Sequence, residues 1–179
     1  MPGSRRYQGT ALSVADQGSI ILGSTSGRAA RSRLLTGAGG LVDVFDTRVL
    51  ADGPSGRRAV NAPLLAEIIF KTQASKAFVE FVGARPREGA VGAVAFGRLR
   101  VVVEGVLGAA GVPATIAPAA WKRAVGLPAG REGAKDAARS EAIRRWPAKA
   151  ALFARVKDDG RAEAALITVA GLLREARHV

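Results

Sequence analysis

The sequence of 179 residues contains no cysteine, and its only histidine is His178. A chain without cysteine has no disulfide framework and no thiolate metal site. A single histidine so close to the end of the sequence also argues against histidine-based catalysis and against a histidine-based zinc site. If the protein uses a metal ion, carboxylates must hold it, and such ligands favour Mg²⁺ or Mn²⁺.

Long apolar runs are also missing. No stretch approaches the roughly 18 consecutive apolar residues of a transmembrane helix, and no signal-peptide core follows the basic start. We therefore expect a cytoplasmic protein with no membrane partner. Residues 1–18 are polar and unpatterned, so we expect a poorly ordered tail there, followed by a single domain over residues 19–177.

Acidic residues are few. Against 27 Lys and Arg stand 15 Asp and Glu, which gives a net charge of +12. This balance suggests a polyanionic partner, and nucleic acid is the commonest one. Ten cations gather between residues 121 and 157, opposed by three acidic residues. These cations are Lys122, Arg123, Arg131, Lys135, Arg139, Arg144, Arg145, Lys149, Arg155 and Lys157.

Aromatic residues make up only 5% of the chain, but Trp121, Trp146 and Phe153 are interleaved with these cations. Lysine and arginine bind phosphates, and an exposed aromatic ring can stack on a base. Core packing is the alternative for both tryptophans, and we favour it for Trp146, which precedes a proline. The predicted DNA-binding residues are Trp121, Lys122, Arg123, Lys135 and Arg139.

Hydrophobic periodicity and turn residues predict alternating strands and helices. Strands are expected at 19–23 and 41–45, paired as a hairpin, and at 76–83 and 114–116. Helices are expected at 63–72, with Asn61 as its N-cap, and at 91–110, 134–146 and 161–177. This order predicts an α/β fold in which helices cover a mixed sheet.

The strand at 76–83 carries an acidic residue, Glu80, among apolar neighbours on both sides. Both faces of this strand are expected to be covered, as in the central strand of an α/β sheet. A carboxylate there is costly unless an arginine, a lysine or a metal ion compensates its charge. The ordinary alternative is a glutamate at the strand end that reaches water or an arginine.

Two more carboxylates, Asp159 and Glu163, lie four residues apart where the last helix begins. This spacing places both on one face of the helix, one turn apart. The alternative is an acidic N-terminus that complements the helix dipole. Asp158 is expected to cap the helix or to face solvent.

Five stretches, in this order, resemble the RuvC-type Holliday-junction resolvases, in particular their compact phage-like members. They are Glu80 in its apolar strand, Phe96-Gly97-Arg98 in the long helix, the turn Pro118-Ala-Ala-Trp121-Lys122, Lys135, and Asp158-Asp159-Gly160-Arg161-Ala162-Glu163-Ala164. The resemblance covers approximately residues 19–175.

The resemblance implies a ribonuclease-H-like fold, in which helices flank both faces of a mixed sheet. It also implies a homodimeric endodeoxyribonuclease that resolves Holliday junctions or other branched DNA, with Mg²⁺ or Mn²⁺ as cofactor. Glu80, Asp159 and Glu163 match the catalytic metal ligands of the family, and Lys122 and Lys135 match phosphate contacts. Two close divalent ions, which such a reaction uses, need several converging carboxylates.

The match fails at the first strand. The family has an aspartate two residues after the glycine that closes this strand, and here Thr25 stands in its place. Arg28, Arg31 and Arg33 interrupt what should be a second apolar strand. A pair of compensating frame shifts around residues 24–33 would explain both departures, because suitable codons read one base earlier encode Ile-Asp-Leu-Gly.

If the chain is made as written, one carboxylate is missing from the site. A catalytically impaired DNA-binding homologue is therefore the main alternative to an active nuclease. A basic structural protein whose carboxylates are ordinary helix caps is the third interpretation.

Overall fold

The computed structural model describes residues 21–25, 31–35, 41–46, 49–51, 58–72, 76–81, 89–112, 115–128 and 133–177. The predicted tail, residues 1–18, lies outside these ranges, as does His178. None of the helices in the described ranges is long and apolar enough to cross a membrane.

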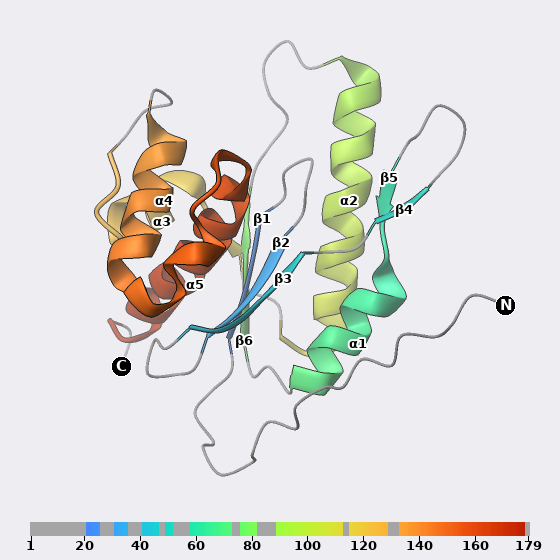
Figure 1. The fold of residues 1–179 in the computed structure, drawn as a ribbon. Helices are drawn as coiled ribbons and strands as arrows, with labels where there is room; N and C mark the ends of the chain where they lie inside the picture. The colour runs from blue at the N-terminus through green and yellow to red at the C-terminus, as the bar shows by residue number, and fades with distance from the viewer. Residues whose placement is uncertain are drawn as a thin grey trace, which may run out of the picture.

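A five-stranded sheet forms the centre of the fold (Figure 1). Its order is β3 (Leu41–Asp46), β2 (Arg31–Leu35), β1 (Ile21–Thr25), β6 (Lys76–Glu80) and β7 (Thr115–Ile116). The first three strands pair antiparallel, whereas β6 is parallel to β1 and β7 is parallel to β6. The sheet is therefore mixed. A separate pair of short strands consists of β4 (Val49–Ala51) and β5 (Arg58–Val60).

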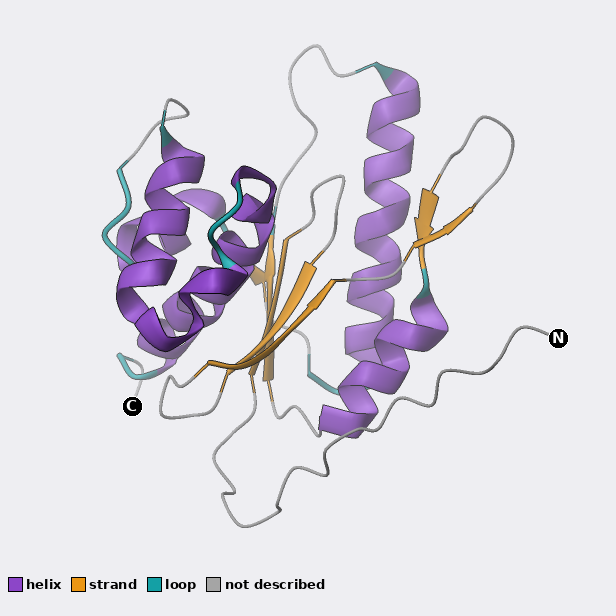
Figure 2. Cartoon of the chain, viewed as in Figure 1, coloured by secondary structure: helices purple, strands orange, loops and turns teal. Residues whose placement is uncertain are grey.

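Helices lie on both sides of this sheet (Figures 1 and 2). One side carries α1 (Ala62–Thr72) and α2 (Ala90–Ala109). The other carries α3 (Pro118–Ala124), α4 (Ala134–Arg145) and α5 (Asp159–Glu175), with the 3-10 turns η2 (Pro147–Leu152) and η3 (Val156–Asp158) between α4 and α5. The predicted α/β class is confirmed.

The strand β6 shows how the sequence places its acidic residue. Ala77 and Val79 pack in the core on the α1–α2 side, whereas Phe78 packs in the core on the α3–α5 side. Because side chains alternate along a strand, Glu80 belongs to the same face as Phe78. The strand therefore ends with its carboxylate on the α3–α5 side of the sheet.

The helix α5 packs close to β6. At Gly171 an added Cβ would lie 2.3 Å from the ring of Phe78, so only a glycine allows this approach. Residues 164–171 of α5 are buried without interruption. This contact fixes the distance between the helix that carries Asp159 and Glu163 and the strand that carries Glu80.

Several expected elements match the structure. The predicted helices at 63–72, 91–110 and 134–146 correspond to α1, α2 and α4 within one residue at each end. The backbone amide of Leu64 donates a hydrogen bond of 3.1 Å to Asn61 Oδ1, which confirms Asn61 as the N-cap of α1.

Other expectations are wrong. The predicted hairpin between 19–23 and 41–45 does not form, because β2 lies between β1 and β3. Arginines do not interrupt β2, since backbone pairing with both neighbours forms this strand whatever its side chains are. The stretch expected as a turn around Trp121 is the helix α3, α5 begins at Asp159 rather than at Arg161, and β6 ends at Glu80.

Candidate active site

Glu80 receives a hydrogen bond from a tryptophan. The indole Nε1 of Trp121 donates to Glu80 Oε1 at 2.9 Å, and this contact joins the end of β6 to α3. Trp121 itself is 0% exposed and packs in the core beside α5. The prediction that Trp121 binds DNA through an exposed ring is therefore wrong, because no face of the ring is open to a base.

The helix α5 supplies the other two predicted ligands. Asp159 lies in its first turn, and Asp159 Oδ2 forms an ion pair of 2.6 Å with Lys135 Nζ from α4. The hydrogen bond to Asp159 raises the pKa of Lys135 above its ordinary value, and the charge of Glu163 contributes in the same direction. Lys135 therefore lies near both acidic residues of α5.

The pKa of Glu163 depends on several neighbouring charged residues. Burial raises its pKa from 4.5 to about 7, and repulsion from Glu80 and Asp159 adds to the shift. The positive charges of Lys122 and Lys135 act in the opposite direction. Three carboxylates and two lysines, from β6, α3, α4 and α5, are thus close enough to influence one titration.

The strand register gives the place of Thr25. The parallel pairing of β1 with β6 matches Gly23 with Phe78 and Ser24 with Val79. One step further along both strands, Thr25 ends β1 at the level of Glu80. The position where the family resemblance requires another carboxylate is therefore adjacent to Glu80 in the sheet.

The carboxylates of this site are ligands of the type that a divalent cation prefers, but they are too few. Carboxylate oxygens are the ligands that Mg²⁺ and Mn²⁺ prefer, and the crowding of charge that raises the pKa of Glu163 is relieved by a cation. Within the described ranges, however, no three acidic side chains form a ready metal site. Lys135 already neutralises Asp159, so a cation has to compete with this lysine.

Asp158 has a structural role next to the site. It is 1% exposed, and its carboxylate accepts hydrogen bonds from Arg155 Nε at 2.9 Å and Arg155 Nη2 at 3.0 Å. It also caps the turn η3 by accepting from the backbone amide of Arg155 at 3.2 Å. The bonds from Arg155 lower the pKa of Asp158. Asp158 is the N-cap residue of α5 by position, but its side chain makes no capping hydrogen bond to that helix, so the expected capping of the last helix is wrong. The side chain does not face solvent either.

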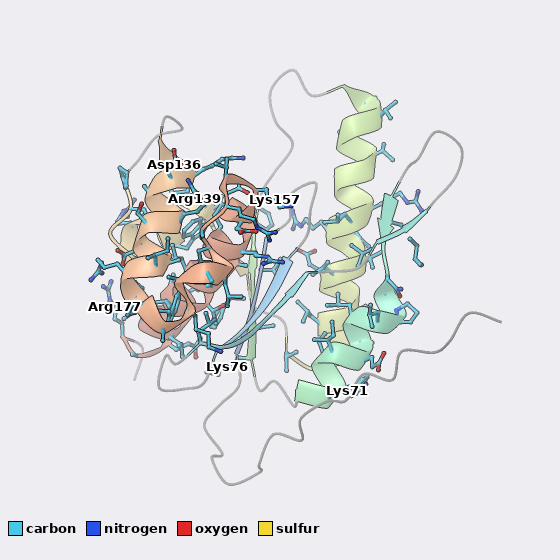
Figure 3. The ribbon with its side chains drawn as sticks, viewed as in Figure 1. Lys71, Lys76, Asp136, Arg139, Lys157 and Arg177 are labelled. Carbon is cyan, nitrogen blue, oxygen red and sulfur yellow. The ribbon has the colours of Figure 1, made fainter. Side chains whose placement is uncertain are left out.

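Many cations of the basic stretch are engaged in ion pairs. Arg139, whose side chain is 17% exposed, donates to the Ala154 carbonyl at 3.0 Å and pairs with Asp136 (Figure 3). Its predicted DNA-binding role is not supported, because these bonds hold the guanidinium against the protein. Glu141 pairs with Arg144 and Arg145 at 2.8 and 2.6 Å.

Several cations of the basic stretch are exposed, including Lys135 although it pairs with Asp159. Arg123 is exposed, Lys122 is partly exposed, and the side chain of Lys135 is 75% exposed. Lys149 and Lys157 are exposed beyond them, while Arg131 lies outside the described residues. The surface beside the carboxylates therefore retains positive charge in the range where the sequence predicted it.

No family model and no curated protein matches the sequence. Solved structures of similar fold include two of Thermus thermophilus RuvC. The structure of Thermus thermophilus RuvC in complex with Holliday junction substrate aligns with a TM-score of 0.67 at 16% identity, covering 89% of this chain and 96% of that one. A second Thermus thermophilus RuvC structure aligns with a TM-score of 0.55 at 13% identity over the same shares. The chain therefore has the α/β fold of these RuvC structures, as the resemblance in the sequence predicts.

Proposed function

We propose that this protein binds branched DNA such as a Holliday junction in the cytoplasm and hydrolyses a phosphodiester bond there with Mg²⁺ or Mn²⁺. The observation that supports the proposal is that the charges of Glu80 and Asp159 both raise the pKa of Glu163, while the charges of Lys122 and Lys135 lower it. The similar fold of a RuvC structure in complex with a Holliday junction supports the choice of substrate.

The acidic residues and the lysines have separate roles in this proposal. Glu80, Asp159 and Glu163 would hold a divalent cation, which supplies charge relief on the reacting phosphate. Lys122 and Lys135, together with Arg123, would bind the phosphates on either side. Lys135 would then exchange its ion pair with Asp159 for a phosphate when a cation enters.

A second function, binding without cleavage, is favoured by the charge balance of the same site. Lys122 and Lys135 already act on Glu163 through their charges, and Lys135 pairs with Asp159. Thr25 supplies no negative charge at the level of Glu80. Two close divalent cations need dense negative charge, which this set of residues does not offer. A chain with this site would recognise a junction but cleave it poorly.

Nicking and binding of a labelled four-way junction separate the two functions. We expect the chain to bind the junction more tightly than duplex DNA, and the affinity to fall steeply with salt. Replacing Lys122 with alanine should lower the salt slope by about 1, whereas Lys71→Ala on α1 should not change it. Equal affinity for junction and duplex at every salt concentration would contradict junction specificity.

The cleavage experiment uses three proteins: the chain as written, a chain in which residues 24–33 are replaced by Ile-Asp-Leu-Gly-Pro-Arg-Gly-Ala-Leu-Ala, and the Glu80→Gln variant of this replaced chain. If the nuclease proposal holds, the replaced chain nicks the junction only with Mg²⁺ or Mn²⁺, and adding Glu80→Gln abolishes nicking. Weak nicking by the chain as written favours an impaired enzyme. No nicking by the replaced chain would reject the nuclease proposal in favour of binding alone.

We also propose that the protein is a homodimer joined through α2. Three valines on this helix, Val91, Val94 and Val101, are 71%, 63% and 68% exposed. They belong to a row of exposed residues spaced alternately by three and four positions, the repeat that joins paired helices. The row consists of Val91, Val94, Arg98, Val101, Gly105 and Gly108. A two-fold dimer would offer two equivalent sites to a four-way junction.

Light scattering tests the dimer. We expect the mass of two chains for the protein as written and of one chain after Val94→Lys and Val101→Lys. The control is Val156→Lys on η3, where a valine that is 77% exposed lies on the other side of the sheet. A single-chain mass for the unmodified protein, with and without DNA, would contradict the proposal.

A further inference from the structure

We infer that Trp121 is a positioning residue, which holds Glu80 in the carboxylate site and holds Lys122 beside it. The inference rests on the proposed function, since it assigns a role within the same site. Trp121 matched the family resemblance only as part of a turn, and its burial rules out the stacking role that the sequence suggested.

The first argument is the hydrogen bond between the two side chains. An indole has a single donor, and when it is buried this donor must find an acceptor. Trp121 is 0% exposed, and its Nε1 finds Glu80 Oε1 at 2.9 Å. Because the ring is fixed on all sides by the core, the oxygen that accepts this bond is fixed with it.

The second argument is the lysine that follows in the sequence. Lys122 Nζ lies 5.6 Å from the centroid of the Trp121 ring, at a distance where the ring attracts a cation. The same lysine acts on Glu163 through its charge. One buried ring therefore contacts a carboxylate through its N–H group and a cation through its face.

The consequence concerns affinity for metal and for phosphate. A group that orients a ligating carboxylate typically changes metal affinity by about 10- to 100-fold when it is removed. An exposed cation–π contact is worth about 0.5–1 kcal/mol, which corresponds to roughly two- to fivefold in affinity. Loss of the ring contact should therefore be visible in DNA binding even without metal.

The chain contains a matched control, because it has two tryptophans. Trp146 is partly buried and packs with its ring centroid 6.0 Å from that of Phe153, in the same core. Trp121→Phe removes the N–H donor beside Glu80, whereas Trp146→Phe removes a similar volume at the other end of the core. Both variants lose packing, and only the first loses the contact with Glu80.

The test compares three measurements on the full chain. In ¹H–¹⁵N spectra, Glu80→Gln should move the indole N–H signal of Trp121 and leave that of Trp146 in place. Mn²⁺ affinity, measured by paramagnetic resonance, should fall about 10- to 100-fold in Trp121→Phe and remain unchanged in Trp146→Phe. Junction affinity in EDTA should fall roughly two- to fivefold in Trp121→Leu, which leaves no ring for Lys122, and not in Trp146→Leu.

The outcomes distinguish this inference from the proposed function. If the unmodified chain binds no Mn²⁺, the proposed metal-dependent function is wrong. The indole N–H signals and the junction affinity in EDTA still test whether Trp121 positions Glu80 and Lys122. If both phenylalanine variants bind Mn²⁺ alike, or if Glu80→Gln leaves the Trp121 signal in place, the positioning of Glu80 is overturned. If both leucine variants bind the junction alike, the positioning of Lys122 is overturned. The Glu80→Gln variant keeps Trp121 itself, so its spectra still test the hydrogen bond if Trp121→Phe does not fold.

Discussion

The face of the sheet under α1 and α2 has an aliphatic core, whereas the face under α3, α4 and α5 holds all the buried aromatic rings of the described core. The rings are those of Phe78, Trp121 and Phe153. The charged groups differ in the same way. The carboxylates that interact with one another lie on the aromatic side, while the ion pairs of α1 and α2 join residues one turn apart in the same helix.

Under the two proposals, the two sides of one sheet serve different purposes. On the α3–α5 side, rigid aromatic packing surrounds charged groups, and Trp121 links the two kinds of residue. On the α1–α2 side, a row of exposed valines follows the outer surface of α2. We assign chemistry to the first side and association between chains to the second, so substitutions of one residue type should have different effects on the two sides.

The largest expected difference is between two phenylalanines. Phe153, 0% exposed, lies in the aromatic core, and Phe70 on α1 is 71% exposed. Phe153→Ala should lower the free energy of unfolding by about 3–5 kcal/mol. Phe70→Ala should change it by about 0.5 kcal/mol or less. Urea unfolding checks both, and similar losses in the two variants would contradict the assignment of the core.

Replacing Glu163 and replacing Glu67 should change the free energy of unfolding by amounts that differ by up to about 3 kcal/mol. The pKa of Glu163 is about 7 in the folded chain and 4.5 ordinarily, so the folded state binds this proton more tightly. The stability that Glu163 contributes is therefore present below pH 4.5 and is lost as the pH rises to 7. Glu163→Gln should keep this stability at pH 8, whereas Glu67→Gln on α1 should change little.

Chemical unfolding of the two glutamine variants at pH 4.5 and pH 8 measures this effect. The gain of Glu163→Gln over the unmodified chain should appear only at the higher pH. The same gain at both pH values would mean that the charge of Glu163 is not the cause.

Two glycines should give effects of opposite sign. Gly171→Ala places a methyl group against the ring of Phe78 and should cost about 1–3 kcal/mol. Gly97→Ala in α2 meets nothing within 4 Å and should stabilise the chain by about 0.5–1 kcal/mol, because alanine favours a helix. Thermal unfolding gives both signs, and a neutral Gly171→Ala would show that α5 can move away from β6.

Local patterns explain why much of the fold could be predicted. The helix α1 has its apolar residues on one face and an asparagine cap, and both signals lie within the segment itself. Glu80 could be assigned to a buried strand because its apolar neighbours alternate between two cores. The spacing of Asp159 and Glu163 likewise placed them on one face of α5.

The errors arise where distant contacts decide the structure. The strand β2 contains arginines, yet it forms because its backbone pairs with both β1 and β3. No local sequence preference indicates this pairing. The bond between Trp121 and Glu80 joins residues 41 positions apart, so the sequence indicated an aromatic residue beside a lysine but not its acceptor. The sequence predicts Arg139 as a DNA contact, but its guanidinium donates to the Ala154 carbonyl, 15 positions away, and no local pattern indicates this bond.

The central claim is that Glu80, Asp159 and Glu163 form one site that a divalent cation completes. Its most direct test is the titration of the Glu163 carboxyl carbon in ¹³C-labelled protein, assigned with Glu163→Gln and recorded with and without Mg²⁺. We expect a midpoint at about pH 7 without the cation, because burial and the two neighbouring carboxylates raise the pKa. We also expect a clear fall of this midpoint when Mg²⁺ is added. A midpoint close to 4.5 that Mg²⁺ does not move would contradict the existence of this site.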